Sequence, residues 1–152
     1  MRSQAELGNE RSGSLFGIRA MPRFVVLRHE CPADYVRPSH WDLMLESEGH
    51  LRTWALLHPP DLGEPITAEA LDNHRLEYLD YEGPISKGPV LKGPVSKDRG
   101  SVARWDRGTY QVEYEDSHQL VVVLRGGRLV GRATLTRLPG DDPQWTFVLA
   151  AR

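Results

Sequence analysis

The chain has 152 residues, of which 39% are hydrophobic and 26% charged, and its formal net charge is −2. This length suits one domain with its own hydrophobic core, and the chain lacks an apolar run long enough for a transmembrane helix. The N-terminus also lacks the apolar stretch of a secretory signal, so we expect a soluble, cytoplasmic protein. Because Cys31 is the single cysteine, an internal disulfide and a Cys-rich zinc site are excluded. Any bound metal is expected to rely on His and carboxylate ligands.

The near-neutral total charge conceals an uneven distribution along the chain. Residues 29–82 carry three Arg and twelve acids, which gives a formal charge of −9. Residues 1–28, 83–107 and 121–152 carry +3, +4 and +3. This pattern fits a basic face beside a carboxylate-rich pocket, and it also fits dispersed, solvated surface charge.

The chain begins with a segment of low hydrophobicity. Residues 1–20 are rich in Ser, Gly, Arg and Glu and show no apolar periodicity. Such a segment buries too little apolar surface to fold, so we expect residues 1–22 to be a disordered extension. Residues 23–152 are then expected to form a single domain.

The rest of the chain has mostly strand-like patterns. The Glu48-Gly49-His50 turn predicts a hairpin, and Thr67 to Asn73 is the one segment with a convincing helical pattern, about two turns long. Short strands joined by tight turns favour an antiparallel barrel or sandwich. Apolar runs and alternating patterns predict strands at residues 24–28, 40–46, 51–57, 101–107, 109–115, 119–125, 128–137 and 144–150.

A five-residue unit, Gly-Pro-x-x-Lys, occurs three times in succession over residues 83–97. Proline at every fifth position withholds a backbone N–H, which argues against a central strand, and we expect a mobile loop with three lysines. Such a loop is either a solvated surface insertion or a point of contact for phosphate groups.

The strand at residues 40–46 carries the most informative polar pattern. Because side chains alternate along a strand, His40, Asp42, Met44 and Glu46 share one face, and the intervening apolar residues face the core. His40 and Asp42 are then about 7 Å apart along the strand, a spacing that suits two ligands of one cation. His29 ends the preceding strand and is the candidate third ligand. The alternative is a structural or solvent-facing role for these histidines.

Three ordered sequence blocks extend this pattern into a family resemblance. The first joins His29 to the His-x-Asp strand and to an acidic-Gly turn and a Trp at residues 48–54. The second is His-Arg-Leu-Glu-Tyr at residues 74–78 followed by Asp-Tyr-Glu-Gly, and the third is Trp-Asp-Arg-Gly-Thr-Tyr at residues 105–110. Over residues 24–150 the sequence resembles the 3'-phosphoesterase domain of bacterial DNA ligase D and its stand-alone relatives. That family has a small antiparallel β-barrel, so we expect a mainly β fold with one short helix and long loops.

The resemblance implies roles for particular residues. The metal ligands of the family fall on His29, His40 and Asp42, and its phosphate-contacting catalytic residues fall on His74 and Tyr78. The implied cofactor is Mn²⁺, with Zn²⁺, Fe²⁺ and Co²⁺ as alternatives. A divalent cation on two imidazoles and one carboxylate keeps open positions for water and a phosphate oxygen.

The sequence departs from the family pattern where the family places basic residues. Met44 stands where the family has an Arg, so a cationic clamp on the phosphate is missing. His58 aligns with another basic position of the family. Arg37 is close to His40 in the sequence and could replace a missing basic residue of the family. We therefore expect both His58 and Arg37 to contact the substrate phosphate. Cys31 is expected to be an inert thiol, although a thiolate there would favour zinc.

The resemblance, taken with these residues, implies three possible functions. The leading one is a manganese-dependent phosphoesterase that processes 3'-phosphate or 3'-ribonucleotide ends of nucleic acid in DNA repair. The alternative is a module that binds 3' ends with its metal site retained and its catalysis weakened. The third is an Fe(II) metalloenzyme. The expected partners are 3' ends of DNA or of DNA/RNA primer–templates, with ligase and polymerase acting in trans. We expect no membrane association and a monomer.

Overall fold

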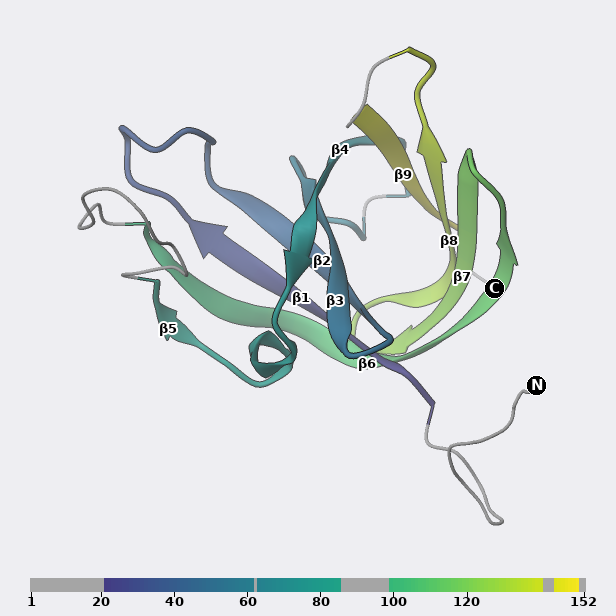
Figure 1. Cartoon of the computed structure of the whole chain (residues 1–152), viewed down its shortest axis with the longest axis horizontal. Helices are drawn as coiled ribbons and strands as arrows, with labels where there is room; N and C mark the ends of the chain where they lie inside the picture. Colours follow the sequence, from purple (N-terminus) through teal and green to yellow (C-terminus); the bar gives the residue numbers. More distant parts are fainter. Residues whose placement is uncertain (1–20, 62, 86–98, 141–143, 151–152) are drawn as a thin grey trace.

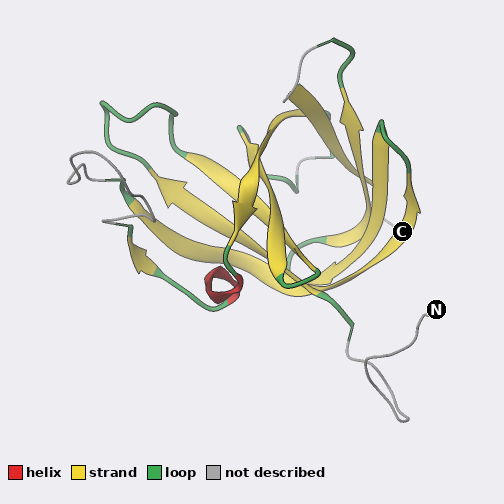
Figure 2. Cartoon of the chain, in the orientation of Figure 1, coloured by secondary structure: helices red, strands yellow, loops and turns green. Residues whose placement is uncertain are grey.

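A computed structural model describes residues 21–61, 63–85, 99–140 and 144–150 of the chain. Residues 1–20 of the expected N-terminal extension lie outside these ranges. The Gly-Pro-x-x-Lys segment lies outside them from residue 86 onward. Within the described ranges, most of the chain is strand (Figure 2), and no helix there is long and apolar enough to cross a membrane.

Eight antiparallel strands close into a barrel (Figure 1), which confirms the predicted fold class. They follow the order β1-β2-β3-β4-β9-β8-β7-β6, and pairing of β1 with β6 closes the barrel. The short strand β5 pairs with the beginning of β6, outside the ring. The elements are β1 (Arg23–Glu30), β2 (His40–Ser47), β3 (His50–Leu56), β4 (Ile66–His74), the 3₁₀ helix η1 (Leu76–Leu79), β5 (Gly83–Pro84), β6 (Ser101–Glu115), β7 (Gln119–Gly126), β8 (Val130–Arg137) and β9 (Gln144–Ala150).

Strands β1 and β2 are buried on both faces. Phe24 and Val26 belong to the barrel interior, a cluster to which all eight barrel strands contribute. Val25 and Leu27 alternate with them and point outward. This outward side forms a second cluster, the outer cluster, which consists of Val25, Leu27, Met44, Leu51, Leu79 and Val102, with Tyr78 and Ile85 packed against it. Residues from η1 and from both sides of the β5–β6 connection therefore cover one outer face of the barrel.

The structure corrects two predicted elements. The segment from Thr67 to Asn73 is not a helix but part of β4, which pairs with both β3 and β9. Two neighbouring strands satisfy its backbone groups, and this tertiary pairing overrides a weak local preference. The short helix lies instead at η1, just after β4. The two strands expected on either side of Gly108 form the single long strand β6, because this glycine allows close approach to the Arg125 backbone rather than a turn.

Asp106 is a buried carboxylate with a structural role. Its two oxygens accept hydrogen bonds from the backbone N–H groups of Gly127, Arg128 and Leu129 at 2.8, 3.0 and 2.8 Å. These contacts tie the β7–β8 turn to β6. The Trp-Asp-Arg-Gly block is thus explained by folding: the aspartate closes a turn, and the glycine makes room for β7.

Candidate metal centre

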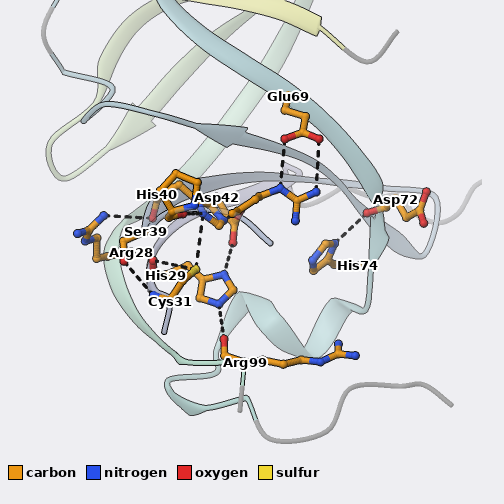
Figure 3. A network of polar contacts seen from close by, with 12 residues as sticks. Arg28, His29, Cys31, Ser39, His40, Asp42, Glu69, Asp72, His74 and Arg99 are labelled. Atoms are coloured by element: carbon orange, nitrogen blue, oxygen red, sulfur yellow. Dashed lines mark hydrogen bonds and ion pairs between the residues drawn. The ribbon is translucent and has the colours of Figure 1, made fainter. Parts of the chain in front are cut away.

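The register of β1 and β2 brings the predicted polar residues together. His29 pairs directly with His40 across the two strands, and Asp42 follows two residues later on the same outward face. All three are buried. The alternation that places Leu43 in the barrel interior therefore places a carboxylate and two imidazoles on the outer face, where they lie close together (Figure 3).

The two imidazoles face the same carboxylate. His29 Nδ1 lies 3.4 Å from Asp42 Oδ2, and His40 Nε2 lies 3.0 Å from Asp42 Oδ1. The two imidazole rings meet edge to face, with their centroids 4.8 Å apart. One oxygen of the carboxylate is thus directed to each histidine.

Backbone carbonyls orient both rings from behind. His29 Nε2 lies 2.8 Å from the Arg99 carbonyl oxygen, and His40 Nδ1 lies 2.7 Å from the Pro38 carbonyl oxygen. Because a carbonyl only accepts hydrogen bonds, these two nitrogens carry protons and donate them. When the rings are neutral, the other two nitrogens, which face Asp42, therefore carry lone pairs and no protons.

Charge interactions hold this cluster in its ionised form. Burial tends to raise the pKa of Asp42, but contacts with His29 and His40 outweigh it and lower the pKa to about 2. For His40, burial tends to lower the pKa, but the Asp42 carboxylate and the Pro38 carbonyl raise it above its usual 6.5. The metal-free cluster therefore favours a carboxylate beside a protonated imidazole.

The same donors fit a cation. Neutral imidazole nitrogens facing carboxylate oxygens bring lone pair against lone pair, an arrangement that needs a positive charge between them. Asp42 Oδ1 is buried and accepts no hydrogen bond of good geometry among the described residues, despite its closeness to His40. A proton or a metal ion supplies the missing positive charge, and imidazole and carboxylate are ordinary ligands of divalent transition metals.

Cys31 adds a sulfur donor to this region. One ligand atom from each of His29, Cys31 and His40 lies within 4.8 Å of the others, so this set could also bind a metal ion. Cys31 Sγ lies 3.9 Å from His40 Nδ1, the nitrogen on the Pro38 side of the ring. Burial raises the pKa of the Cys31 thiol, as does the nearby Asp42 carboxylate. The two donor sets share both imidazoles but approach His40 from different sides.

A pocket of about 490 Å³ opens beside the cluster. Strands β1 and β2 form one wall, the end of β4 with η1 a second, and the residues flanking β5 and β6 a third. It unites the residues predicted as metal ligands with those predicted to contact phosphate, except His58, which is exposed in the loop after β3 and lines no part of this pocket. The lining residues are His29, Tyr35, Arg37, His40, Asp42, Met44, Leu71, Asp72, Asn73, His74, Arg75, Tyr78, Ile85, Arg99 and Val102.

His74 and Tyr78 stand together in the second wall. His74 Nδ1 lies 2.9 Å from the Asp72 carbonyl oxygen, to which it donates, so Nε2 is free for the pocket. The rings of His74 and Tyr78 meet edge to face, with centroids 5.8 Å apart. Burial raises the pKa of Tyr78 above its usual 10, so its hydroxyl keeps its proton at neutral pH.

Comparison with known proteins identifies the family. The sequence model of the DNA Ligase D 3'-phosphoesterase domain matches residues 29–137, a range that contains every residue of the pocket. This chain belongs to the DNA ligase D 3'-phosphoesterase domain family. The matched range is well over half of the chain, which confirms the resemblance seen in the sequence.

Three multifunctional non-homologous end joining proteins are among the relatives of this 3'-phosphoesterase domain. The LigD proteins of Mycobacterium bovis and Mycobacterium tuberculosis are 35% identical to it over an alignment of 126 residues that covers 78% of this chain. LigD of Pseudomonas aeruginosa is 31% identical over an alignment of 137 residues that covers 84% of this chain. Each alignment covers 15% of the relative, so this chain corresponds to a small part of those proteins.

The basic residues of this family member are arranged differently from the sequence-based assignment. Arg37 lines the pocket, but its guanidinium pairs with Glu69 through contacts of 3.1 and 3.4 Å. Met44 is 1% exposed and belongs to the outer cluster. Arg75 and Arg99 line the pocket and were not predicted. Arg75 directly follows His74 in the second sequence block, a signal that pointed to it; Arg99 had only the basic character of residues 83–107.

Proposed function

We propose that this chain is a metal-dependent phosphoesterase that removes 3'-phosphate or 3'-ribonucleotide ends from nucleic acid during DNA repair. The observation that carries the proposal is the shared pocket: a buried cluster with a carboxylate and two imidazoles forms one wall, and His74 and Tyr78 stand in the next. Membership of the 3'-phosphoesterase domain family supports it.

We assign the metal to His29, His40 and Asp42 and expect Mn²⁺. Both imidazoles are held by backbone carbonyls so that their free nitrogens face the carboxylate, and Asp42 Oδ1 has an unfilled acceptor position. Nitrogen and oxygen ligands suit Mn²⁺, as they do Fe²⁺, Co²⁺ and Zn²⁺. When bound, such a metal neutralises phosphate charge and activates a water molecule.

His74 and Tyr78 act on the phosphate from the second wall of the pocket. His74 faces the phosphate with Nε2, because its Nδ1 is already used by the Asp72 carbonyl, and the imidazolium form of the ring donates from Nε2 to a phosphate oxygen. Tyr78 offers a neutral hydroxyl donor, since burial keeps its phenol protonated. Donors fixed in a partly buried pocket stabilise the charge that develops on the phosphate without needing to reorganise.

The test is release of inorganic phosphate from a 3'-phosphorylated primer–template in the presence of Mn²⁺. We expect turnover by the wild type and a loss of about a hundredfold or more in His40→Ala and His74→Ala. The matched control is His118→Ala, because His118 is exposed in the β6–β7 turn and lies outside the pocket. Equal rates in wild type and His40→Ala, or no turnover in either, would overturn the proposal.

A second candidate function is recognition of 3' ends without turnover, and Met44 favours it. This thioether cannot donate to phosphate, yet it lines the pocket with its stem among apolar residues. An arginine at this position would keep its stem in the outer cluster and direct its guanidinium to the pocket. Phosphate release that appears only in Met44→Arg, with end binding in both proteins, would establish the binding module.

In repair, we propose that the chain acts together with ligase and polymerase activities supplied in trans. The relatives are named as multifunctional non-homologous end joining proteins, and this chain aligns with 15% of their length. Pull-down of end-joining proteins on DNA that carries a 3'-phosphate, with and without this chain, tests the proposal. Recruitment that does not depend on the chain would contradict it.

A further inference from the structure

The backbone of Arg99 is built into the metal-centre wall. Its carbonyl oxygen accepts a hydrogen bond from His29 Nε2 at 2.8 Å, and its own N–H donates to the Ile85 carbonyl at 3.2 Å. Ile85 N–H in turn donates to the Gly100 carbonyl at 2.8 Å. Gly100 has a φ of +87°, and a Cβ there would overlap the Glu30 carbonyl oxygen. Arg99 is therefore held at a fixed place beside the end of β1 (Figure 3).

The side chain of Arg99 belongs to the same pocket. Arg99 is half-buried and lines the cavity next to Ile85 and Val102. Its guanidinium is close enough to Tyr78 to act on the phenol electrostatically, as a positive charge that opposes the effect of burial. Figure 3 shows the side chain leading away from the carbonyl that His29 contacts. The backbone carbonyl of Arg99 thus contacts the proposed metal centre, and its side chain lines the pocket in which the substrate is expected to bind.

The three arginines that line the pocket differ in how their charge is used. Arg37 is engaged by Glu69 in a two-point ion pair, and Arg75 lies 3.7 Å from Glu77. No carboxylate among the described residues forms an ion pair with the Arg99 guanidinium. A half-buried guanidinium with no carboxylate partner in the described part of the chain suits phosphate binding, because it is weakly hydrated and offers two parallel N–H donors.

We propose that Arg99 binds the terminal phosphate of the substrate and supplies the guanidinium that Met44 lacks. This inference rests on the proposed function, since it names the group that recognises a phosphate at the same site. The guanidinium contacts nonbridging oxygens from the β5–β6 side of the pocket, whereas Met44 lines the pocket from β2. It thereby sets a preference for ends that carry a phosphate over ends that carry a hydroxyl.

The variant Arg99→Met tests this role cleanly, because it removes the guanidinium and retains the backbone carbonyl that orients His29. We expect the Kd for a 3'-phosphorylated oligonucleotide, measured by fluorescence anisotropy in EDTA, to rise at least about tenfold. The preference over the 3'-hydroxyl oligonucleotide should disappear, while Mn²⁺ affinity measured by calorimetry stays at the wild-type value. Arg99→Lys should retain part of the preference through its point charge.

The matched control is Arg125→Met, which removes an exposed arginine of β7 that lies outside the pocket. Its affinity for both oligonucleotides should stay within about twofold of the wild type, because one exposed charge contributes little at physiological salt. Wild-type phosphate preference in Arg99→Met, or a parallel loss of Mn²⁺ binding, would overturn the inference.

Measurements of phosphate release and of 3'-phosphate binding separate the role of Arg99 from the phosphoesterase activity. A wild type that releases phosphate at the rate of Arg99→Met would refute the role of Arg99 and leave the phosphoesterase standing. A wild type that binds 3'-phosphate through Arg99 but never releases it would support the inference and refute the phosphoesterase.

Discussion

Asp42 is the carboxylate of the proposed metal centre, and Asp42→Asn isolates its charge at nearly constant side-chain volume. Contacts with His29 and His40 lower its pKa from 3.8 to about 2. A lowering of this size corresponds to about 2 kcal/mol of folding stability at neutral pH. The carboxylate is almost fully buried, so solvent screening reduces this figure little.

The sign of this contribution follows from the direction of the shift. Because the folded-state pKa of Asp42 is depressed, its stabilisation is present above about pH 4 and is lost as the pH falls toward 2. The pKa of His40 is raised, so its stabilisation is present below its usual 6.5 and is lost as the pH rises through the folded-state value. The metal-free cluster therefore contributes most between about pH 4 and 6.5. A metal must displace the His40 proton, so metal affinity should increase with pH.

The assay is urea unfolding of wild type and Asp42→Asn at several pH values from 2 to 8, in EDTA and in Mn²⁺. At pH 5 in EDTA we expect the variant to be less stable by about 2 kcal/mol, with a flatter dependence between pH 4 and 2. At a Mn²⁺ concentration of 100 times its Kd, the wild type should gain about 2.7 kcal/mol and the variant almost nothing.

Asp61→Asn is the matched control, because Asp61 is exposed and lies outside the pocket. It should show the acid dependence and Mn²⁺ stabilisation of the wild type. If Asp42→Asn retained the wild-type loss of stability below pH 4, or if Mn²⁺ stabilised it as strongly as the wild type, the assigned electrostatics of the cluster would be wrong.

Three further substitutions test the scaffold and the donor set. Asp106→Ala leaves three backbone N–H groups without their acceptor and should lower the free energy of unfolding in urea by about 3 kcal/mol or more; a loss below about 1 kcal/mol would contradict the turn-closing role. Gly100→Ala forces a side chain against the Glu30 carbonyl and should weaken both stability and Mn²⁺ affinity, because it displaces the carbonyl that orients His29. An unfolding free energy and a Mn²⁺ affinity equal to those of the wild type, measured by calorimetry, would refute this prediction. Cys31→Ser removes the soft donor and should reduce Zn²⁺ affinity at least about tenfold while sparing Mn²⁺; equal effects on both metals in competition titrations would argue against two donor sets.

The strand pattern of this chain could be predicted because it is local. Alternation with a period of two places His40 and Asp42 on one face and Leu43 on the other, whatever the strand pairs with. The position of His29 at the end of the preceding strand was enough to predict that it lies beside His40, and the register confirms it. The same regularity made the barrel and the family recognisable from sequence.

The predictions that proved wrong concern segments in which contacts between distant parts of the chain outweigh the local conformational preference. The segment at residues 67–73 has helix-forming residues, but pairing with β3 and β9 makes it a strand. Gly108 has the composition of a turn, but space for the Arg125 backbone is what it provides. His58 aligned with a basic family position, yet its loop leaves it outside the pocket.

By itself, then, the sequence determined that His40 and Asp42 share one face of a strand and that His29 ends the strand before it, since residue identity and strand alternation are local. Only the tertiary structure decided how those groups are held and charged. The carbonyls that orient His29 and His40 come from Arg99 and Pro38, and the partner of Arg37 is Glu69 on another strand. Whether a cation is free or paired depends on such contacts, which folding creates between residues far apart in the chain. For that reason Arg99 became visible as a phosphate-binding candidate only once the chain was folded.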